Sequence, residues 1–128
     1  MATVRYIVSD VEAAVAFYTK CLGFEVQQQF GPAMAILRSR DLTLWVAGPQ
    51  ASASRPMPDG RKPEPGGWGR FVLEVDDLEN MVGKLRERGV TFRNAIVTGP
   101  GGRQILCEDP SGNVVELFEA PKPAQTSS

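Results

Sequence analysis

The sequence contains no histidine among its 128 residues. Imidazole is a favoured ligand of zinc, iron and nickel, and it is the usual base beside a catalytic cysteine. A Cys-His catalytic pair is therefore excluded, and any transition-metal site would have to be built without its commonest ligand.

Cysteine, net charge and long apolar runs are also scarce. Cys21 and Cys107 form no CxxC pattern, so both are expected to be reduced, partly buried thiols. A net charge of −1 favours neither a nucleic-acid partner nor a membrane partner. No run approaches the roughly 18 apolar residues of a membrane span, and the opening MATVRYIVSD lacks the basic and apolar regions of a signal peptide. We therefore expect a cytoplasmic protein.

The chain contains an internal repeat. Residues 4–26, VRYIVSDVEAAVAFYTKCLGFEV, can be laid over residues 71–92, FVLEVDDLENMVGKLRERGVTF, so that Asp10 meets Asp77. Each copy has a strand of alternating apolar residues, an acidic cap, a helix with an apolar stripe and a terminal glycine. Capping boxes are predicted at Ser9 with Glu12 and at Asp76 with Glu79.

Three further strands are predicted after each glycine. They cover residues 24–30, 33–39 and 42–47 in the first copy and 90–97, 103–108 and 113–119 in the second. The predicted fold class is thus α+β, with two paired, duplicated βαβββ modules. The predicted boundaries are a first module at 1–47, a linker rich in Pro and Gly at 48–69, a second module at 70–120 and a flexible tail at 121–128.

The segments SDVEAAVAFYTKCLGFEV, VDDLENMVGKLRERGVTF and EDPSGNVVELFE resemble the vicinal oxygen chelate superfamily. This superfamily includes glyoxalase I, extradiol dioxygenases and bleomycin-resistance proteins, and the resemblance covers residues 3 to about 120. It implies a cup-shaped mixed sheet with helices on its outer face, a site in the cup between the modules, and a homodimer. Open sheet edges in so short a chain also favour a dimer.

The resemblance further implies four inward positions for metal ligands, namely a residue that opens the first strand of each module and a residue in its last strand. Aligned on this sequence, the four are Thr3, Leu44, Arg70 and Glu116. Only Glu116 is a good ligand, whereas Arg70 repels a cation and can pair with Glu116. We therefore expect no metal ion and no cofactor.

Alternation within the strands predicts which side chains line the cup. With Trp68 as a lid aromatic, the predicted ligand-binding residues are Thr3, Arg5, Leu44, Val46, Trp68, Arg70, Val72, Glu74, Glu116 and Phe118. An apolar wall with convergent charged groups is typical of a small-molecule site. In the alternative interpretation, two internal ion pairs merely fill the cup.

Two functions remain open at this point. The first is a metal-free binding protein of the bleomycin-resistance kind, which holds a small organic acid or an aromatic ligand. The second is a metal-independent lyase or isomerase, with Glu116 or Glu74 as the acid or base and Arg70 or Arg5 as the anion stabiliser. A metal-dependent glyoxalase or dioxygenase is the third and least favoured hypothesis, because the ligands are missing.

Overall fold

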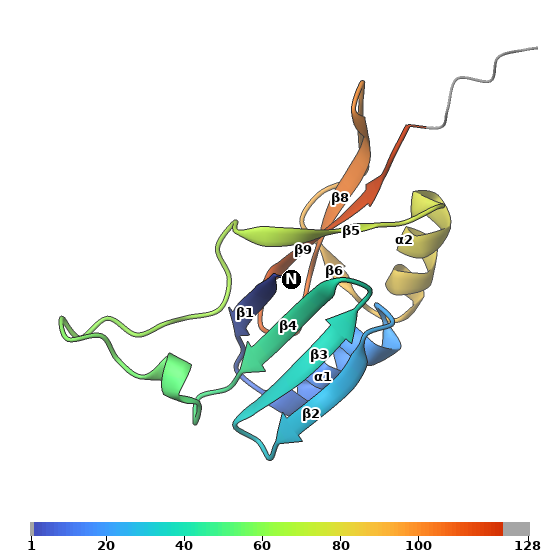
Figure 1. Cartoon of the computed structure of the whole chain (residues 1–128). Helices are drawn as coiled ribbons and strands as arrows, with labels where there is room; N and C mark the ends of the chain where they lie inside the picture. The colour runs from blue at the N-terminus through green and yellow to red at the C-terminus, as the bar shows by residue number, and fades with distance from the viewer. Residues whose placement is uncertain (1, 122–128) are drawn as a thin grey trace, which may run out of the picture. The chain divides into compact units, whose positions relative to one another are not determined.

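The computed structural model describes residues 2–121 and divides into two compact units (Figure 1). The first unit contains the described residues up to Gly69 together with Asp109–Asn113. The second contains Arg70–Glu108 and the described residues from Val114 onward. The chain thus changes units after the linker, and the short loop between its last two strands belongs with the first module.

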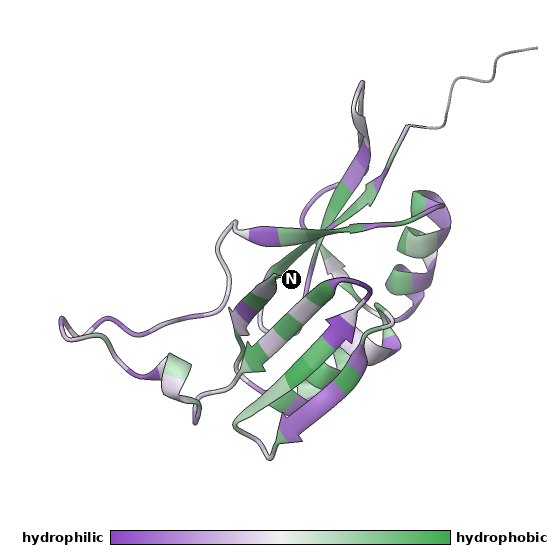
Figure 2. Cartoon of the chain, in the orientation of Figure 1, coloured by the Kyte–Doolittle hydropathy of each residue, from purple (hydrophilic) through white to green (hydrophobic). Residues whose placement is uncertain are grey.

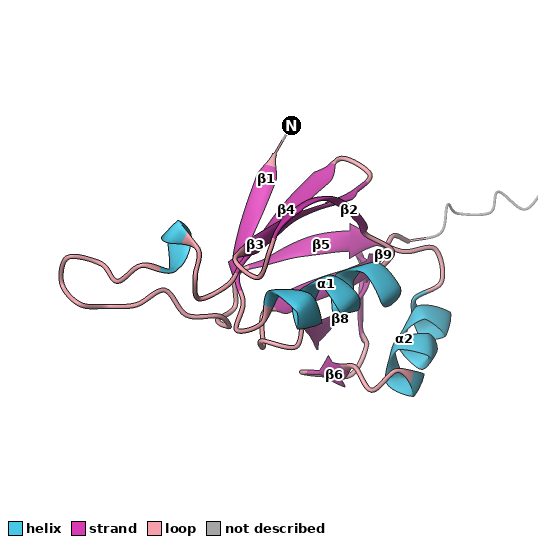
Figure 3. Cartoon of the chain, turned by 90° about the horizontal axis from the view of Figure 1, so that it is seen from below, coloured by secondary structure: helices cyan, strands magenta, loops and turns pink. Residues whose placement is uncertain are grey.

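The first unit is a four-stranded sheet covered on one face by a helix. Its elements are β1 (Thr3–Ile7), α1 (Val11–Lys20), β2 (Glu25–Phe30), β3 (Met34–Ser39) and β4 (Leu42–Ala47), and the strand order is β1-β4-β3-β2. Strands β1 and β4 are parallel and the other pairs are antiparallel. Helix α1 contacts β2, β3 and β4, and it lies behind these strands in Figure 1 and to one side of them in Figure 3.

The core of this unit lies between α1 and the sheet. The helix buries Val11, Ala14, Phe17 and Tyr18, and the sheet buries Tyr6, Ala35, Leu37, Leu44 and Val46. In Figure 2 the central strands β3 and β4 are mostly apolar, whereas the edge strand β2 is largely polar. The apolar alternation of the sequence therefore selects the face that meets the helix.

Both helices begin one residue later than the predicted capping boxes. The carboxylate of Asp10 accepts hydrogen bonds from the backbone N–H groups of Glu12 and Ala13, at 3.0 and 3.2 Å. In the second module, Asp77 accepts from the backbone of Asn80 at 3.1 Å. Each aspartate is extended and directly precedes the helix, so it reaches the unpaired N–H groups of the first turn.

The second unit repeats the plan with a five-stranded sheet. Its elements are β5 (Arg70–Glu74), α2 (Leu78–Glu87), β6 (Thr91–Phe92), β7 (Val97–Gly99), β8 (Gly102–Glu108) and β9 (Val114–Glu119). The order is β5-β9-β8-β6, and β7 also pairs with β8. Helix α2 contacts β9 and buries Leu78, Val82 and Leu85. The predicted fold class, α+β with two βαβββ modules, is confirmed.

One predicted strand is interrupted. Residues 90–97 form two short strands, β6 and β7, instead of one. The side-chain oxygen of Asn94 accepts a hydrogen bond from the backbone N–H of Leu106 at 2.9 Å. This side chain replaces a backbone carbonyl of the ladder and lets the chain leave the sheet at residues 93–96.

The linker, residues 48–69, belongs to the first unit and contains a short 3₁₀ helix, Ser52–Ser54. Apart from Pro121, the tail expected at 121–128 lies outside the described residues. Neither cysteine is in a disulfide within the described residues; Cys107 is buried and Cys21 is half-buried. Between residues 2 and 121 no helix is long and apolar enough to cross a membrane.

The loop Asp109–Asn113 is held in the first unit by a buried carboxylate. Asp109 is 4% exposed and accepts a hydrogen bond from the Tyr18 hydroxyl at 2.8 Å. It also accepts from the backbone N–H groups of Ser111 and Asn113, both at 2.9 Å. The side chain of Asn113 in turn donates to the carbonyl of Ile7 and accepts from the N–H of Gly66, both at 2.8 Å. This network joins α1, β1, the linker and the loop.

Replacing Tyr18 by Phe tests this network. The ring remains in the core, but the buried Asp109 carboxylate loses one of its donors. Hydrogen bonds to charged groups contribute about 1.5–3 kcal/mol, and because the other donors remain we expect Tyr18→Phe to lower the free energy of unfolding by about 1–2 kcal/mol. Urea unfolding of the variant and the wild type measures the difference, and an unchanged midpoint would contradict this role for Asp109.

Candidate functional site

Each sheet has one face covered by its helix and a second face, here called its open face. On the open face of the first sheet, Arg5 of β1 pairs in register with Trp45 of β4. The guanidinium carbon of Arg5 lies 4.8 Å from the centre of the Trp45 ring, which is the geometry of a cation–π contact. Thr3, at the start of β1, is exposed.

The predicted placement of Leu44 and Val46 beside Arg5 is wrong. Both side chains are 0% exposed and lie in the core, on the face that meets α1. The sequence alignment was shifted by one residue, and a shift of one residue moves every side chain of a strand to the other face. The threonine in the run LTLWVA was the available signal, because it indicates that Thr43 and Trp45 belong to the more polar face.

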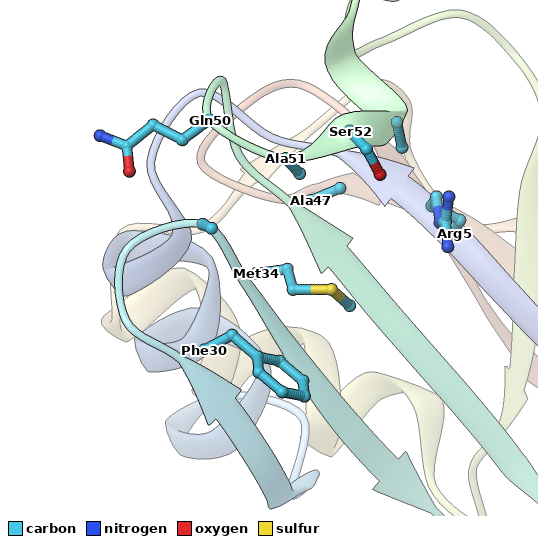
Figure 4. A pocket seen from close by; sticks show the side chains of 9 residues that line it. Arg5, Phe30, Met34, Ala47, Gln50, Ala51 and Ser52 are labelled. Carbon is cyan, nitrogen blue, oxygen red and sulfur yellow. The ribbon is translucent and has the colours of Figure 1, made fainter.

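A cavity of about 280 Å³ lies at one end of this open face, between the sheet and the linker (Figure 4). Phe30 of β2 and Met34 of β3 point into it, and Arg5 borders its opposite side. Ser52 belongs to the turn that forms the rim, whereas Gln50 points away from the other labelled side chains. Of these lining residues, only Arg5 was predicted from the sequence. The cavity forms where the linker turns against the end of the sheet, and strand alternation does not reveal such a contact.

The open face of the second sheet carries the predicted ion pair. Arg70 of β5 donates from Nε to Oε1 of Glu116 on β9 at 2.9 Å. The Glu116 side chain is 10% exposed and that of Arg70 is 31% exposed. The register pairs Val72 with Glu116 and Glu74 with Phe118, so the predicted residues of this module share one face. Glu74 and Val72 are exposed and Phe118 is half-buried.

A second ion pair lies on the same face and was not predicted. Arg93 donates from Nε to Oε2 of Glu108 at 2.7 Å. Glu108 and Leu106 alternate along β8 on the side of Glu116, with which Leu106 pairs in register. Because Arg93 follows a two-residue strand, no periodic pattern in the sequence assigns it to a face.

The helix side of the second unit has a shallower cavity of about 470 Å³, next to α2 and β7. Arg103 borders it and donates to Glu79 at 2.7 Å, with Glu119 at 3.6 Å. The hydrogen bond to Glu79 raises the pKa of Arg103, and the negative charges of Glu79 and Glu119 act in the same direction. Trp68, the predicted lid, is 68% exposed in the linker of the first unit.

The positions of the expected metal ligands can now be corrected. Arg5 is the third residue of β1 and pairs in register with Trp45. Val72 is the third residue of β5 and pairs in register with Glu116. Trp45, and not Leu44, is therefore the counterpart of Glu116. The four side chains are then Thr3, Trp45, Arg70 and Glu116. A hydroxyl, an indole, a guanidinium and one carboxylate do not fit a divalent ion. Within residues 2–121, no group of three or more His, Cys, Asp or Glu side chains has metal-binding geometry.

Comparison with known proteins agrees with this architecture. A sequence profile of the Glyoxalase/Bleomycin resistance protein/Dioxygenase superfamily matches residues 1–117. A superfamily member from Sphaerobacter thermophilus is 31% identical, with a TM-score of 0.73 over 93% of this chain and 95% of that one. A search of curated proteins found no match.

Two further solved structures are similar to this chain. TnmS3, an antibiotic binding protein from Streptomyces, is 27% identical with a TM-score of 0.69 over 93% of both chains. A lactoylglutathione lyase from Agrobacterium tumefaciens shares the fold at 22% identity, with a TM-score of 0.74 over 93% of this chain and 92% of that one. Duplicated βαβββ modules define the class of fold. Within that class, the chain belongs to the Glyoxalase/Bleomycin resistance protein/Dioxygenase superfamily.

The Arg70–Glu116 pair can be measured by a double-mutant cycle. We expect Arg70→Ala and Glu116→Gln to couple by about 1 kcal/mol in the free energy of unfolding, because Glu116 is largely removed from water. The Arg61–Asp59 pair is the matched control, since its 2.8 Å contact has side chains that are 83% and 53% exposed. Its coupling should be about 0–0.5 kcal/mol. Equal coupling in both cycles would show that burial of Glu116 adds nothing.

Proposed function

We propose that this protein binds a small organic molecule, acidic or aromatic, without a metal ion, in the manner of the antibiotic-binding members of its superfamily. The observation that carries the proposal is the Arg70–Glu116 ion pair. It occupies two of the four positions at which metal-dependent relatives are expected to hold their ligands.

The chemistry of the other two positions supports the same proposal. Thr3 offers a single neutral hydroxyl, and Trp45 contacts the cation of Arg5 instead of offering a donor for a metal. Arg70 already supplies a fixed positive charge at the place where a divalent cation would have to approach Glu116. A ligand that carries its own negative group would meet arginine, and its apolar part would meet the exposed Val72 or Phe30.

A metal-independent lyase or isomerase is the second candidate, and one observation favours it. Glu116 is 7% exposed and has Val72 and Leu106 as its register neighbours on the two adjacent strands. A carboxylate in such apolar surroundings can act as an acid or base toward a bound substrate, and Arg70 would stabilise an enolate or carboxylate. Glu74 is the weaker candidate for this role because it is exposed at the end of β5.

The proposal includes a homodimer in the cytoplasm. Strands β1 and β2 are the edges of the first sheet, and every residue of β2 is exposed. Open edges are usually paired or covered, and a two-fold axis can pair the same edge strand of two identical chains. Cys21 and Cys107 are not joined by a disulfide in residues 2–121, which supports a reducing compartment.

Light scattering coupled to size exclusion should give twice the chain mass, and a monomer at all concentrations would contradict the dimer.

Metal analysis tests the proposal directly. Protein purified without a chelator or an affinity tag should contain less than about a tenth of an equivalent of any transition metal. Titration with Zn²⁺, Ni²⁺, Mn²⁺ and Fe²⁺ should give no tight binding. A stoichiometric ion that is lost in Glu116→Ala would overturn the metal-free proposal and would direct assays toward glyoxalase or dioxygenase chemistry.

The enzyme alternative is separated by Glu116→Gln, which keeps the size of the side chain and removes its proton-accepting charge. If the protein only binds its ligand, this variant should change the Kd, and neither the wild type nor the variant should convert the ligand. If the protein is an acid–base enzyme, the variant should lower kcat by about 10²–10⁴-fold while the ligand still binds.

A further inference from the structure

We propose that the cavity of the first unit binds an aromatic carboxylate, with the Arg5 guanidinium holding the carboxylate and Phe30 and Met34 holding the ring. This assignment rests on the proposed small-molecule function and names both the site and the chemical class of the ligand. Of these three residues, only Arg5 is among the cup residues that strand alternation predicts.

Among the described residues that line this cavity, Arg5 is the only charged one. No acidic side chain lines it, and no carboxylate pairs with Arg5 within the described part of the chain, residues 2–121. Three other arginines on or beside the strands are different, since Arg70, Arg93 and Arg103 have a carboxylate at 2.9, 2.7 and 2.7 Å. Arg38 of β3 does not line this cavity and donates to the backbone carbonyl of Arg40 at 3.1 Å. An arginine without an acidic partner at an apolar cavity favours an anionic ligand.

Trp45 orients this arginine. The two residues pair in register on adjacent parallel strands, and the ring lies 4.8 Å from the guanidinium carbon. The contact with the ring holds the guanidinium in place, and a guanidinium is planar, so its N–H groups can donate two parallel hydrogen bonds. A carboxylate accepts this pair of donors, so the guanidinium favours a planar bidentate group over a single-point anion.

The walls of the cavity suit a flat apolar group. Phe30 is 47% exposed and faces Met34 in the register of β2 with β3, and Met34 faces Ala47 in the register of β3 with β4. The ring and the thioether present a polarisable surface to an aromatic ligand. A cavity of about 150 Å³ accommodates benzene, so the 280 Å³ here has room for one or two fused rings with a carboxylate.

The rim of the cavity is a fixed part of the unit. The hydroxyl of Ser54 donates to the carbonyl of Gly48 at 2.7 Å, and the N–H of Ala51 donates to the same carbonyl at 3.0 Å. Gly48 itself donates to the carbonyl of Ala33 at 2.8 Å. A Cβ at Gly48 would lie 2.8 Å from a methyl of Val11 and 3.1 Å from the carbonyl oxygen of Pro32 in the β2–β3 turn, so glycine suits the close approach of the linker to α1 and this turn. The ligand therefore meets a preformed surface.

Methionine methyl NMR can test the site with 2-naphthoate as the probe. With ¹³C-methyl methionine, the Met34 signal should shift on titration and saturate, because the ring current of the naphthalene reaches it. Met57 in the linker and Met81 in α2 do not line this cavity and serve as internal references. 2-Naphthamide, which is neutral, should bind at least about tenfold more weakly, as expected from loss of a charge-assisted hydrogen bond. Acetate, which lacks the ring, should leave Met34 unshifted at the same concentrations.

Variants assign the two parts of the ligand. Arg5→Ala should weaken 2-naphthoate binding by about tenfold or more and should leave 2-naphthamide binding unchanged. Phe30→Ala should weaken both probes, and its exposed position makes it tolerable to the fold if Arg5→Ala proves unstable. Lys20→Ala is the matched control, because it removes one positive charge from the end of α1, away from this cavity. This control should bind as the wild type does.

Several outcomes would overturn the assignment. They are no shift of Met34 up to millimolar probe, equal binding of acid and amide, or loss of binding in Lys20→Ala as large as in Arg5→Ala. If 2-naphthoate binding is lost in Arg70→Ala and kept in Arg5→Ala, the site is wrong although small-molecule binding stands. A stoichiometric metal ion would instead refute the metal-free function, whatever the probe does at Met34.

Discussion

Each helix of the chain must bury its apolar stripe against one face of a four- or five-stranded sheet, and the arrangement of functional side chains follows from this packing. Since side chains alternate along a strand, filling one face with Leu44, Val46 and their neighbours leaves Trp45 and Arg5 on the other. The same rule in the second module buries Phe71, Val115 and Leu117 and leaves Arg70 and Glu116 together. The alternation of side chains along each strand therefore determines both which residues form the core and which residues lie together on the open face.

The sequence predicts these faces wherever the alternation is clear. The resemblance to the superfamily places Arg70 and Glu116 at inward positions, and their opposite charges predict the ion pair that the structure contains. In β4 the alignment of Leu44 with Glu116 was one residue out of register, so the face of Trp45 was predicted wrongly. Residues 93–96 leave the sheet because the Asn94 side chain takes a place in the ladder, which no periodicity reveals. The cavity of the first unit could not be predicted from the sequence, because its rim is a turn of the linker that follows the strands it packs against.

Arginine dominates the polar chemistry of both sheets. A guanidinium cannot lose its proton in proteins, and its donors are fixed in a plane. Three of the arginines are neutralised by glutamates on neighbouring elements, as Arg70 is by Glu116. Arg5 differs because the indole ring of Trp45 contacts it and, among residues 2–121, no carboxylate pairs with it. The charge of the first open face is therefore retained for a partner from solution, whereas the pairs on the second open face are already balanced.

The loop Asp109–Asn113 has a consequence for the ancestry of this duplicated chain. Two copies of one module are expected to begin as self-sufficient parts that a genetic break could separate. Here the carboxylate that accepts the Tyr18 hydroxyl is encoded more than 90 positions downstream, between the last two strands of the other copy. A gene cut at the linker would give a first half that lacks this acceptor. The first copy therefore depends on the second for a buried hydrogen bond, and the two halves cannot be separated at the linker without losing it.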